Sequence, residues 1–148
     1  MRPALYPLRR AAIYQASPAE PDPSNTVRVM VVDDQAPFRR AARAVIGATA
    51  GFEALGDAES GREALRSADQ LEPDLVLIDL HMPGMDGLET ARNLTDSHPE
   101  CVVVLVSLNA LELPAEAVTA CGAAAFVRKQ ELCPATLRSL WSLYGAGD

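Results

Sequence analysis

From Val27 onward, five short apolar runs alternate with five segments of helical periodicity. The runs are VRVMVV (27–32), FEALGDA (52–58), DLVLID (74–79), CVVVLVS (101–107) and AAFV (124–127). Short, nearly continuous apolar runs are typical of strands that are buried on both faces. Strands that alternate with helices predict an α/β fold, in which a five-stranded parallel sheet is covered by helices on both sides.

Residues that start or stop helices delimit the segments between these strands. Pro37 stands in the first turn of a helix predicted over 36–50, and Gly51 marks its end. Ser60 is predicted to cap a helix over 61–68, with Glu63 completing a capping box. Two more helices are predicted over 87–97 and 114–121. The last begins at Pro134 and places an apolar set on one face: Leu137, Leu140, Trp141 and Tyr144.

The first 26 residues differ in composition from the rest of the chain. They contain five of the 11 prolines and show no apolar periodicity. This predicts a flexible, Pro-rich N-terminal arm (1–26) before a single domain (27–148). No apolar run approaches the ~20 residues that a membrane-spanning helix needs, so we expect no contact with a membrane.

Charge and cysteine content narrow the partners and the compartment. The net charge is −7 and no basic block occurs, whereas contacts to nucleic-acid phosphates need clustered Lys or Arg. Direct nucleic-acid binding is therefore not expected. The three cysteines, Cys101, Cys121 and Cys133, have no metal-ligand spacing and lie in apolar surroundings. They are predicted to be buried, reduced thiols, as in a cytoplasmic protein.

Polar residues stand where four of the five apolar runs end. Asp33 and Asp34 follow the first run, Asp79 ends the third, Ser107 ends the fourth and Lys129 follows the fifth. Lys129 is the only lysine among 13 basic residues. The carboxyl ends of parallel strands meet at one edge of the sheet, where ligands bind in such folds. We therefore expect these five side chains to share one site.

The residue types in this predicted site favour phosphoryl transfer. Three crowded carboxylates repel one another and attract a hard divalent cation, most naturally Mg²⁺. A cation, an ammonium and a hydroxyl together hold the oxygens of a phosphoryl group. Asp79 is the natural nucleophile, because a carboxylate can form an acyl phosphate.

Four segments carry a resemblance to a known family. The acidic pair in VMVVDD, the loop LIDLHMPGMDG, the strand end VLVS and the segment FVRK resemble receiver domains of two-component response regulators. The resemblance extends from about Val27 to Tyr144. It implies a doubly wound, flavodoxin-like sheet of strand order 2-1-3-4-5 with five helices.

The resemblance also implies roles for individual residues. Asp79 would accept a phosphoryl group from the phosphohistidine of a sensor histidine kinase or phosphotransfer protein. Asp34, Asp79 and the backbone carbonyl of His81 would bind Mg²⁺ directly, and Asp33 would act through water. Lys129 would pair with the phosphoryl oxygens. Such a protein modifies itself and is not expected to be a turnover enzyme.

In the implied switch, Ser107 moves toward the phosphoryl group and Phe126 turns inward. The face built from the fourth helix, fifth strand and fifth helix would then bind a downstream effector or a second copy of the chain. His81, Leu108 and Asn109 occupy positions that tune how long the phosphoryl group persists. The bulk of Leu108, where the family has a small residue, is expected to narrow access to the site.

Three alternatives stay open at this stage. The domain could act as an interaction module without phosphorylation, or be the receiver fragment of a DNA-binding transcriptional regulator, although YGAGD closes the chain with no such module after it. A haloacid-dehalogenase-like phosphatase uses similar residues. However, those enzymes carry a second Asp two residues after the nucleophile, where this chain has His81.

Overall fold

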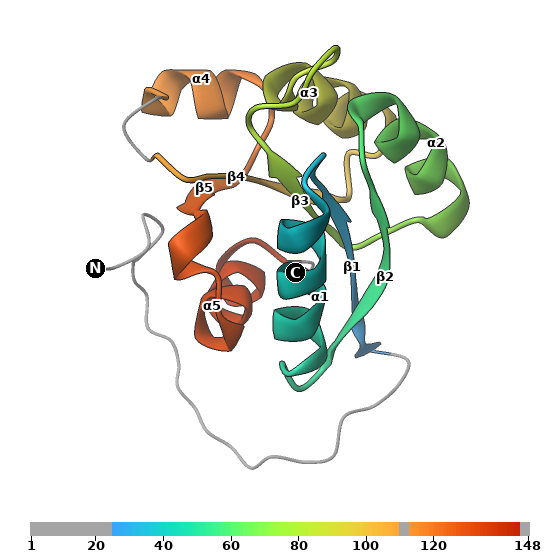
Figure 1. Ribbon diagram of the computed structural model, residues 1–148, viewed down its shortest axis with the longest axis vertical. Coiled ribbons are helices and arrows are strands. Elements are labelled where there is room, and N and C mark those ends of the chain that lie inside the picture. The colour runs from blue at the N-terminus through green and yellow to red at the C-terminus, as the bar shows by residue number, and fades with distance from the viewer. Residues whose placement is uncertain (1–24, 110–112, 146–148) are drawn as a thin grey trace.

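Five parallel strands form the sheet in the order β2-β1-β3-β4-β5, as Figure 1 shows for the computed structural model. The structure describes residues 25–109 and 113–145. The strands are β1 (Val27–Val32), β2 (Phe52–Ala58), β3 (Leu75–Asp79), β4 (Val102–Ser107) and β5 (Ala125–Arg128). The helices are α1 (Ala36–Gly47), α2 (Gly61–Leu71), α3 (Gly87–Ser97), α4 (Ala115–Ala120) and α5 (Pro134–Tyr144), with a short 3-10 helix η3 (Lys129–Glu131). The predicted fold class and strand order are confirmed.

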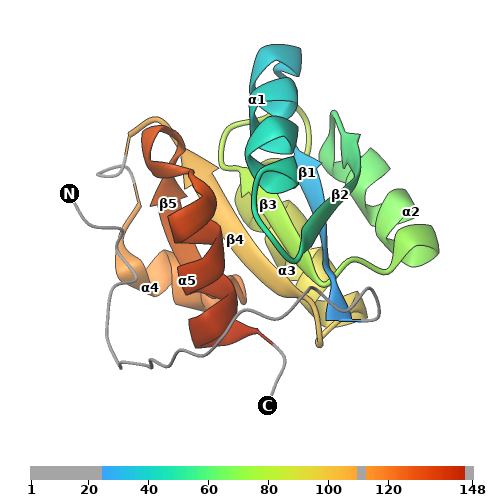
Figure 2. The same cartoon turned by 90° about the horizontal axis from the view of Figure 1, so that it is seen from below.

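Helices cover both faces of the sheet and create two apolar cores (Figure 2). On one face, Val29 and Val31 pack with buried residues of α1 and α5. On the other face, Met30 and Val32 pack with buried residues of α2 and α3. Successive side chains of a strand point to opposite faces, so every inner strand must be apolar on both sides. This explains the nearly continuous apolar runs.

The ends of two helices differ from the predicted ones. The helix predicted over 36–50 ends at Gly47, because the chain turns there: the Thr49 hydroxyl donates to the Val45 carbonyl, and Gly51 has a positive φ of 86°. The helix predicted over 61–68 continues to Leu71 and stops at Glu72, whose backbone is left-handed. Ser60 caps this helix as predicted, by accepting a hydrogen bond from the Glu63 N–H.

The cysteine prediction is right for two positions and wrong for the third. Cys101 and Cys121 are buried, whereas Cys133 is exposed. Cys133 is the residue before α5, where the chain turns into the helix, and its sulfur contacts the Thr136 hydroxyl instead of a core. An apolar neighbourhood in the sequence therefore did not predict burial at this helix start.

Most of the arm predicted over 1–26 lies outside the described residues, since the description begins at Asn25. Within the described ranges, no helix has both the length and the apolar character needed to cross a membrane.

Candidate functional site

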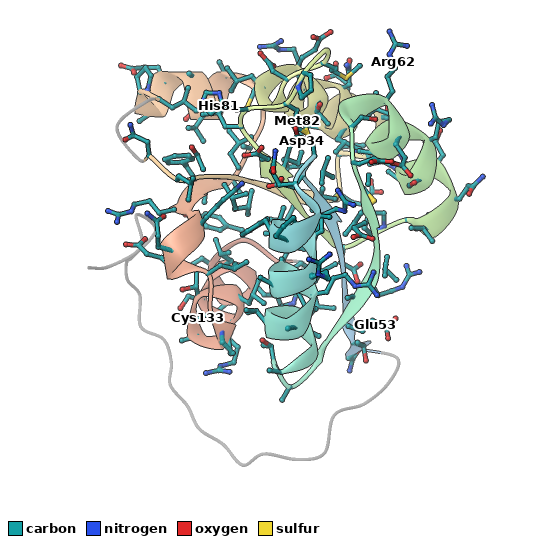
Figure 3. All side chains as sticks on the ribbon, in the orientation of Figure 1. Asp34, Glu53, Arg62, His81, Met82 and Cys133 are labelled. Atoms are coloured by element: carbon teal, nitrogen blue, oxygen red, sulfur yellow. The ribbon has the colours of Figure 1, made fainter. Side chains whose placement is uncertain are left out.

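The carboxyl ends of β1, β3, β4 and β5 bring the predicted site residues to one edge of the sheet. Asp33 and Asp34 directly follow β1, Asp79 is the last residue of β3, and Ser107 is the last of β4. Lys129 begins η3 directly after β5. In Figure 3, the labels of Asp34, His81 and Met82 stand at this edge, and that of Glu53 stands toward the opposite one.

The three aspartates form one acidic cluster. One carboxylate oxygen from each of Asp33, Asp34 and Asp79 lies within 4.8 Å of the others. Asp33 and Asp79 are buried, and Asp34 is half-buried. Oδ2 of Asp33 accepts no hydrogen bond from the described residues, although it is fully shielded from solvent. Hard oxygen donors, crowded negative charge and a buried oxygen with free lone pairs fit a magnesium ion.

The ammonium group of Lys129 balances part of this charge. Its Nζ lies 2.8 Å from Oδ2 of Asp33 and 3.4 Å from Oδ1 of Asp79. The contact with Asp33 is an ion pair that lacks hydrogen-bond geometry, so Oδ2 of Asp33 accepts no hydrogen bond even though the ammonium group is close to it. The Lys129 side chain is only 12% exposed, so its charge acts where water screens it weakly.

Burial raises the pKa of the Asp79 carboxyl above its ordinary value of 3.8, and the negative charge of Asp33 adds to this effect. The charge and hydrogen bond of Lys129 and the backbone N–H of His81 act in the opposite direction but are outweighed. The ionised form of Asp79 is therefore held at a disadvantage. A divalent cation bound to the cluster would relieve it.

Gln35, just before α1, and Arg39 of α1 hold Asp33 in place through hydrogen bonds. Oδ1 of Asp33 accepts a hydrogen bond from the Gln35 N–H at 2.8 Å, which forms the turn into α1. The Arg39 guanidinium donates from Nη1 to the Asp33 carbonyl at 2.8 Å and pairs through Nε with Asp57 at 3.0 Å. Arg43, one turn further along α1, also pairs with Asp57, at 3.2 Å.

Sequence reasoning missed three residues near the site: Phe38, Arg39 and Asp57. It considered only residues at the ends of apolar runs, whereas Phe38 and Arg39 lie on α1 and Asp57 lies within β2. The available signal was the spacing of Arg39 and Arg43, which places two arginines on one face of the predicted helix. Nothing in the sequence paired that face with the end of β2.

The loop HMPGMDG between β3 and α3 needs glycine at two positions. Gly84 has a positive φ of 77°, which L-residues with a side chain rarely adopt. A Cβ at Gly87 would overlap the Asp79 carbonyl oxygen and would lie 2.7 Å from Cα of Leu80. The start of α3 is therefore packed directly against the end of β3, where it sets the position of Asp79.

The predicted switch and tuning residues lie around this cluster. Ser107 is buried, and its Oγ accepts the Asn109 N–H at 3.3 Å. Phe126 is half-buried against the core on the α3 side. Leu108 is 66% exposed, so its side chain extends mainly into solvent. The expected narrowing of access to the site by Leu108 stays a prediction.

An open hollow of about 430 Å³ adjoins the site on the side of the β3–α3 loop. It is mainly apolar, and its lining comes from that loop, α3 and the approach to α4: Leu80, His81, Met82, Pro83, Asp86, Leu88 and Leu113.

Comparison with protein-family models finds the response regulator receiver domain over residues 29–139. Among curated proteins, the response regulator GacA of Pseudomonas viridiflava is 43% identical over 82 residues, which are 55% of this chain and 38% of GacA. The transcriptional regulatory protein YdfI of Bacillus subtilis is 35% identical over 91 residues, 62% of this chain and 43% of YdfI. The match spans less than half of each relative.

Solved structures show the same architecture. The response regulator domain of Thermotoga maritima CheB aligns with a TM-score of 0.72 at 25% identity, over 83% of this chain and 99% of that domain. The signal receiver domain of the putative response regulator NarL from Mycobacterium tuberculosis aligns with a TM-score of 0.69 at 30% identity, over 78% of this chain and 97% of that one.

Proposed function

This chain belongs to the family of response regulator receiver domains of two-component systems, and from that premise we propose that it is a phosphoacceptor switch. In this proposal, Asp79 receives a phosphoryl group from a phosphohistidine on a sensor histidine kinase or phosphotransfer protein. A carboxylate oxygen of Asp79 attacks phosphorus, the phosphorus–nitrogen bond breaks, and the imidazole leaves with its electron pair.

One observation carries the proposal: Asp79 stands 3.4 Å from a buried ammonium group and within a cluster of three carboxylates. Asp33, Asp34, Asp79 and the carbonyl of His81 are the groups that would hold Mg²⁺. When bound, the ion supplies positive charge for the phosphoryl oxygens. Lys129 adds a second positive charge 3.4 Å from Asp79, and the open hollow beside His81 leaves room for the donor.

Phosphorylation then acts as a local change of charge. It adds roughly −1.5 to −2 charges and several strong acceptor oxygens next to Asp79. We expect Ser107, the last residue of β4, and Lys129, directly after β5, to donate to those oxygens. Any arrangement of these strands in which they donate better becomes more populated. We expect Phe126 and the α4–β5–α5 face to carry this change to an effector protein.

Incubation with acetyl phosphate and Mg²⁺, followed by intact-mass measurement, tests the proposal. One added phosphate is expected on the wild type and none on Asp79→Asn. Asp69→Asn, which changes an exposed carboxylate on α2, is the matched control and should be phosphorylated like the wild type. No added phosphate on the wild type, or an equal amount on Asp79→Asn, contradicts the switch and favours an interaction module that works unmodified.

A second candidate follows from the name and length of one relative. YdfI is a transcriptional regulatory protein, and the match covers 43% of it. We propose as the alternative that this chain acts as the receiver segment of a transcriptional regulator and pairs with a second copy through the α4–β5–α5 face. Light scattering with and without acetyl phosphate and Mg²⁺ tests it: phosphorylation should produce a dimer, and a phosphorylated monomer would contradict it.

A further inference from the structure

Lys129 has an aromatic neighbour as well as two anionic ones. Its Nζ lies 4.5 Å from the centre of the Phe38 ring. Phe38 stands in the first turn of α1 and is half-buried against the core on the α1 and α5 side. The ammonium group is thus enclosed by the ring, by Asp33 at 2.8 Å and by Asp79 at 3.4 Å.

The ring and the carboxylates hold the ammonium group in different ways. Carboxylates accept its hydrogen bonds, so a lysine held by them alone has fewer N–H donors left for an incoming phosphoryl group. An aromatic face attracts the positive charge through its quadrupole without accepting a strong hydrogen bond. The ring therefore helps to fix the position of the charge without itself occupying an N–H donor.

Fixing the ammonium group has a cost in conformational entropy, because lysine carries it on a flexible four-carbon side chain. A half-buried ring at the base of the site limits the space open to that side chain before any phosphoryl group arrives. Such preorganisation favours the charged transition state of group transfer.

We propose that Phe38 is a positioning residue for phosphoryl transfer, whose ring holds the Lys129 ammonium beside Asp79. The inference rests on the proposed function of Asp79 and goes beyond it, since it assigns a role to a residue of α1 that binds neither metal nor phosphate. Aromatic character at position 38, and not apolar bulk alone, should then govern the rate of phosphorylation.

The composition of the chain provides a direct reporter of this contact. Lys129 is its only lysine, so lysine labelled with ¹³C and ¹⁵N gives one set of side-chain NMR signals. In the wild-type protein without phosphodonor, the ring current of Phe38 should shift the Lys129 methylene signals away from their unfolded positions. Unshifted signals in the folded wild type would overturn the proposal, and this measurement needs no variant.

Three variants separate aromatic character from packing. Phe38→Leu keeps an apolar side chain but removes the ring, and Phe38→Tyr restores an aromatic face. Phe52→Leu is the matched control, because Phe52 packs against the same core. It lies at the start of β2, opposite Val27, at the edge of the sheet remote from Lys129.

The rate of phosphorylation by acetyl phosphate at saturating Mg²⁺ is compared with thermal unfolding of each variant. We expect Phe38→Leu to be about tenfold slower, which corresponds to about 1.4 kcal/mol, and Phe38→Tyr to recover most of the rate. Phe52→Leu should lose stability without losing rate. Equal rates for Phe38→Leu and the wild type, or an equal loss in Phe52→Leu, would overturn the inference while phosphorylation of the wild type upholds the proposed function. A wild type that is not phosphorylated overturns both.

Discussion

The ammonium nitrogen of Lys129 lies 2.8 Å from the fully buried carboxylate of Asp33, a residue 96 positions earlier in the chain. The contact joins the start of η3, directly after β5, to the loop after β1, across the ends of the intervening β3 and β4. The only lysine of the chain thereby supplies positive charge to two buried carboxylates, those of Asp33 and Asp79.

Replacement of Lys129 by Met should destabilise the folded protein, because it leaves Asp33 and Asp79 buried without this counter-charge. Removing one partner of a buried ion pair costs about 3 kcal/mol, which urea unfolding at pH 7 without metal should detect. Mg²⁺ should restore part of the loss by supplying positive charge. Arg62→Met, which removes a positive charge from an exposed position on α2, should stay within about 0.5 kcal/mol of the wild type.

Asp79→Asn should make the metal-free protein more stable at pH 7. Burial and Asp33 raise the pKa of Asp79 above 3.8, so the folded state binds the proton more tightly than the unfolded state. The stability that this proton contributes is complete below pH 3.8 and is lost as the pH rises through the raised pKa. The advantage of Asp79→Asn, measured by urea unfolding, should therefore shrink as the pH falls from 7 toward 3.8. A constant or growing advantage would contradict this account.

Two glycine-to-alanine changes should have opposite effects on stability. Gly87→Ala places a Cβ against backbone atoms of Asp79 and Leu80, which cannot move aside as a flexible side chain can. We expect a loss of about 3 kcal/mol from overpacking, and weaker Mg²⁺ binding because the end of β3 must shift. Gly47→Ala meets no atom within 4 Å at the end of α1 and should stabilise by about 0.5 kcal/mol. Chemical denaturation of both variants checks the pair.

Arg39→Met should weaken Mg²⁺ binding about tenfold, a typical effect of losing a group that holds metal ligands in place. Arg39 donates to the carbonyl of Asp33 and so fixes the turn that carries both Asp33 and Asp34. The charge of Arg39 is already neutralised by Asp57, so its repulsion of the metal is the smaller effect.

Arg43→Met is the control for this experiment, because Arg43 shares the Asp57 partner and is half exposed, while its described contact does not involve Asp33. Isothermal titration calorimetry should give it the wild-type affinity for Mg²⁺. If Arg39→Met binds Mg²⁺ more tightly, charge repulsion outweighs positioning and the account of Arg39 is wrong.

The elements of the fold could be predicted because their signals are local. The five apolar runs match the five strands to within about a residue at each end, since alternation of buried strands and helices is written into neighbouring residues. Helix ends were less accurate. The end of α1 at Gly47 depends on the turn that follows it. In that turn, the Gly51 carbonyl accepts a hydrogen bond from the N–H of Val27, the first residue of β1.

The amino-acid pattern alone predicts strand ends at five polar residues: Asp33, Asp34, Asp79, Ser107 and Lys129. Parallel topology then requires those ends to meet at one edge of the sheet. Which side chains surround these residues depends on how the helices pack on the sheet. Phe38 reaches Lys129, and Arg39 reaches Asp57, because α1 packs across β1 toward both β2 and the loop after β5. Such contacts join residues that are distant in the chain, so they depend on how whole elements pack and leave no periodic signal in the sequence.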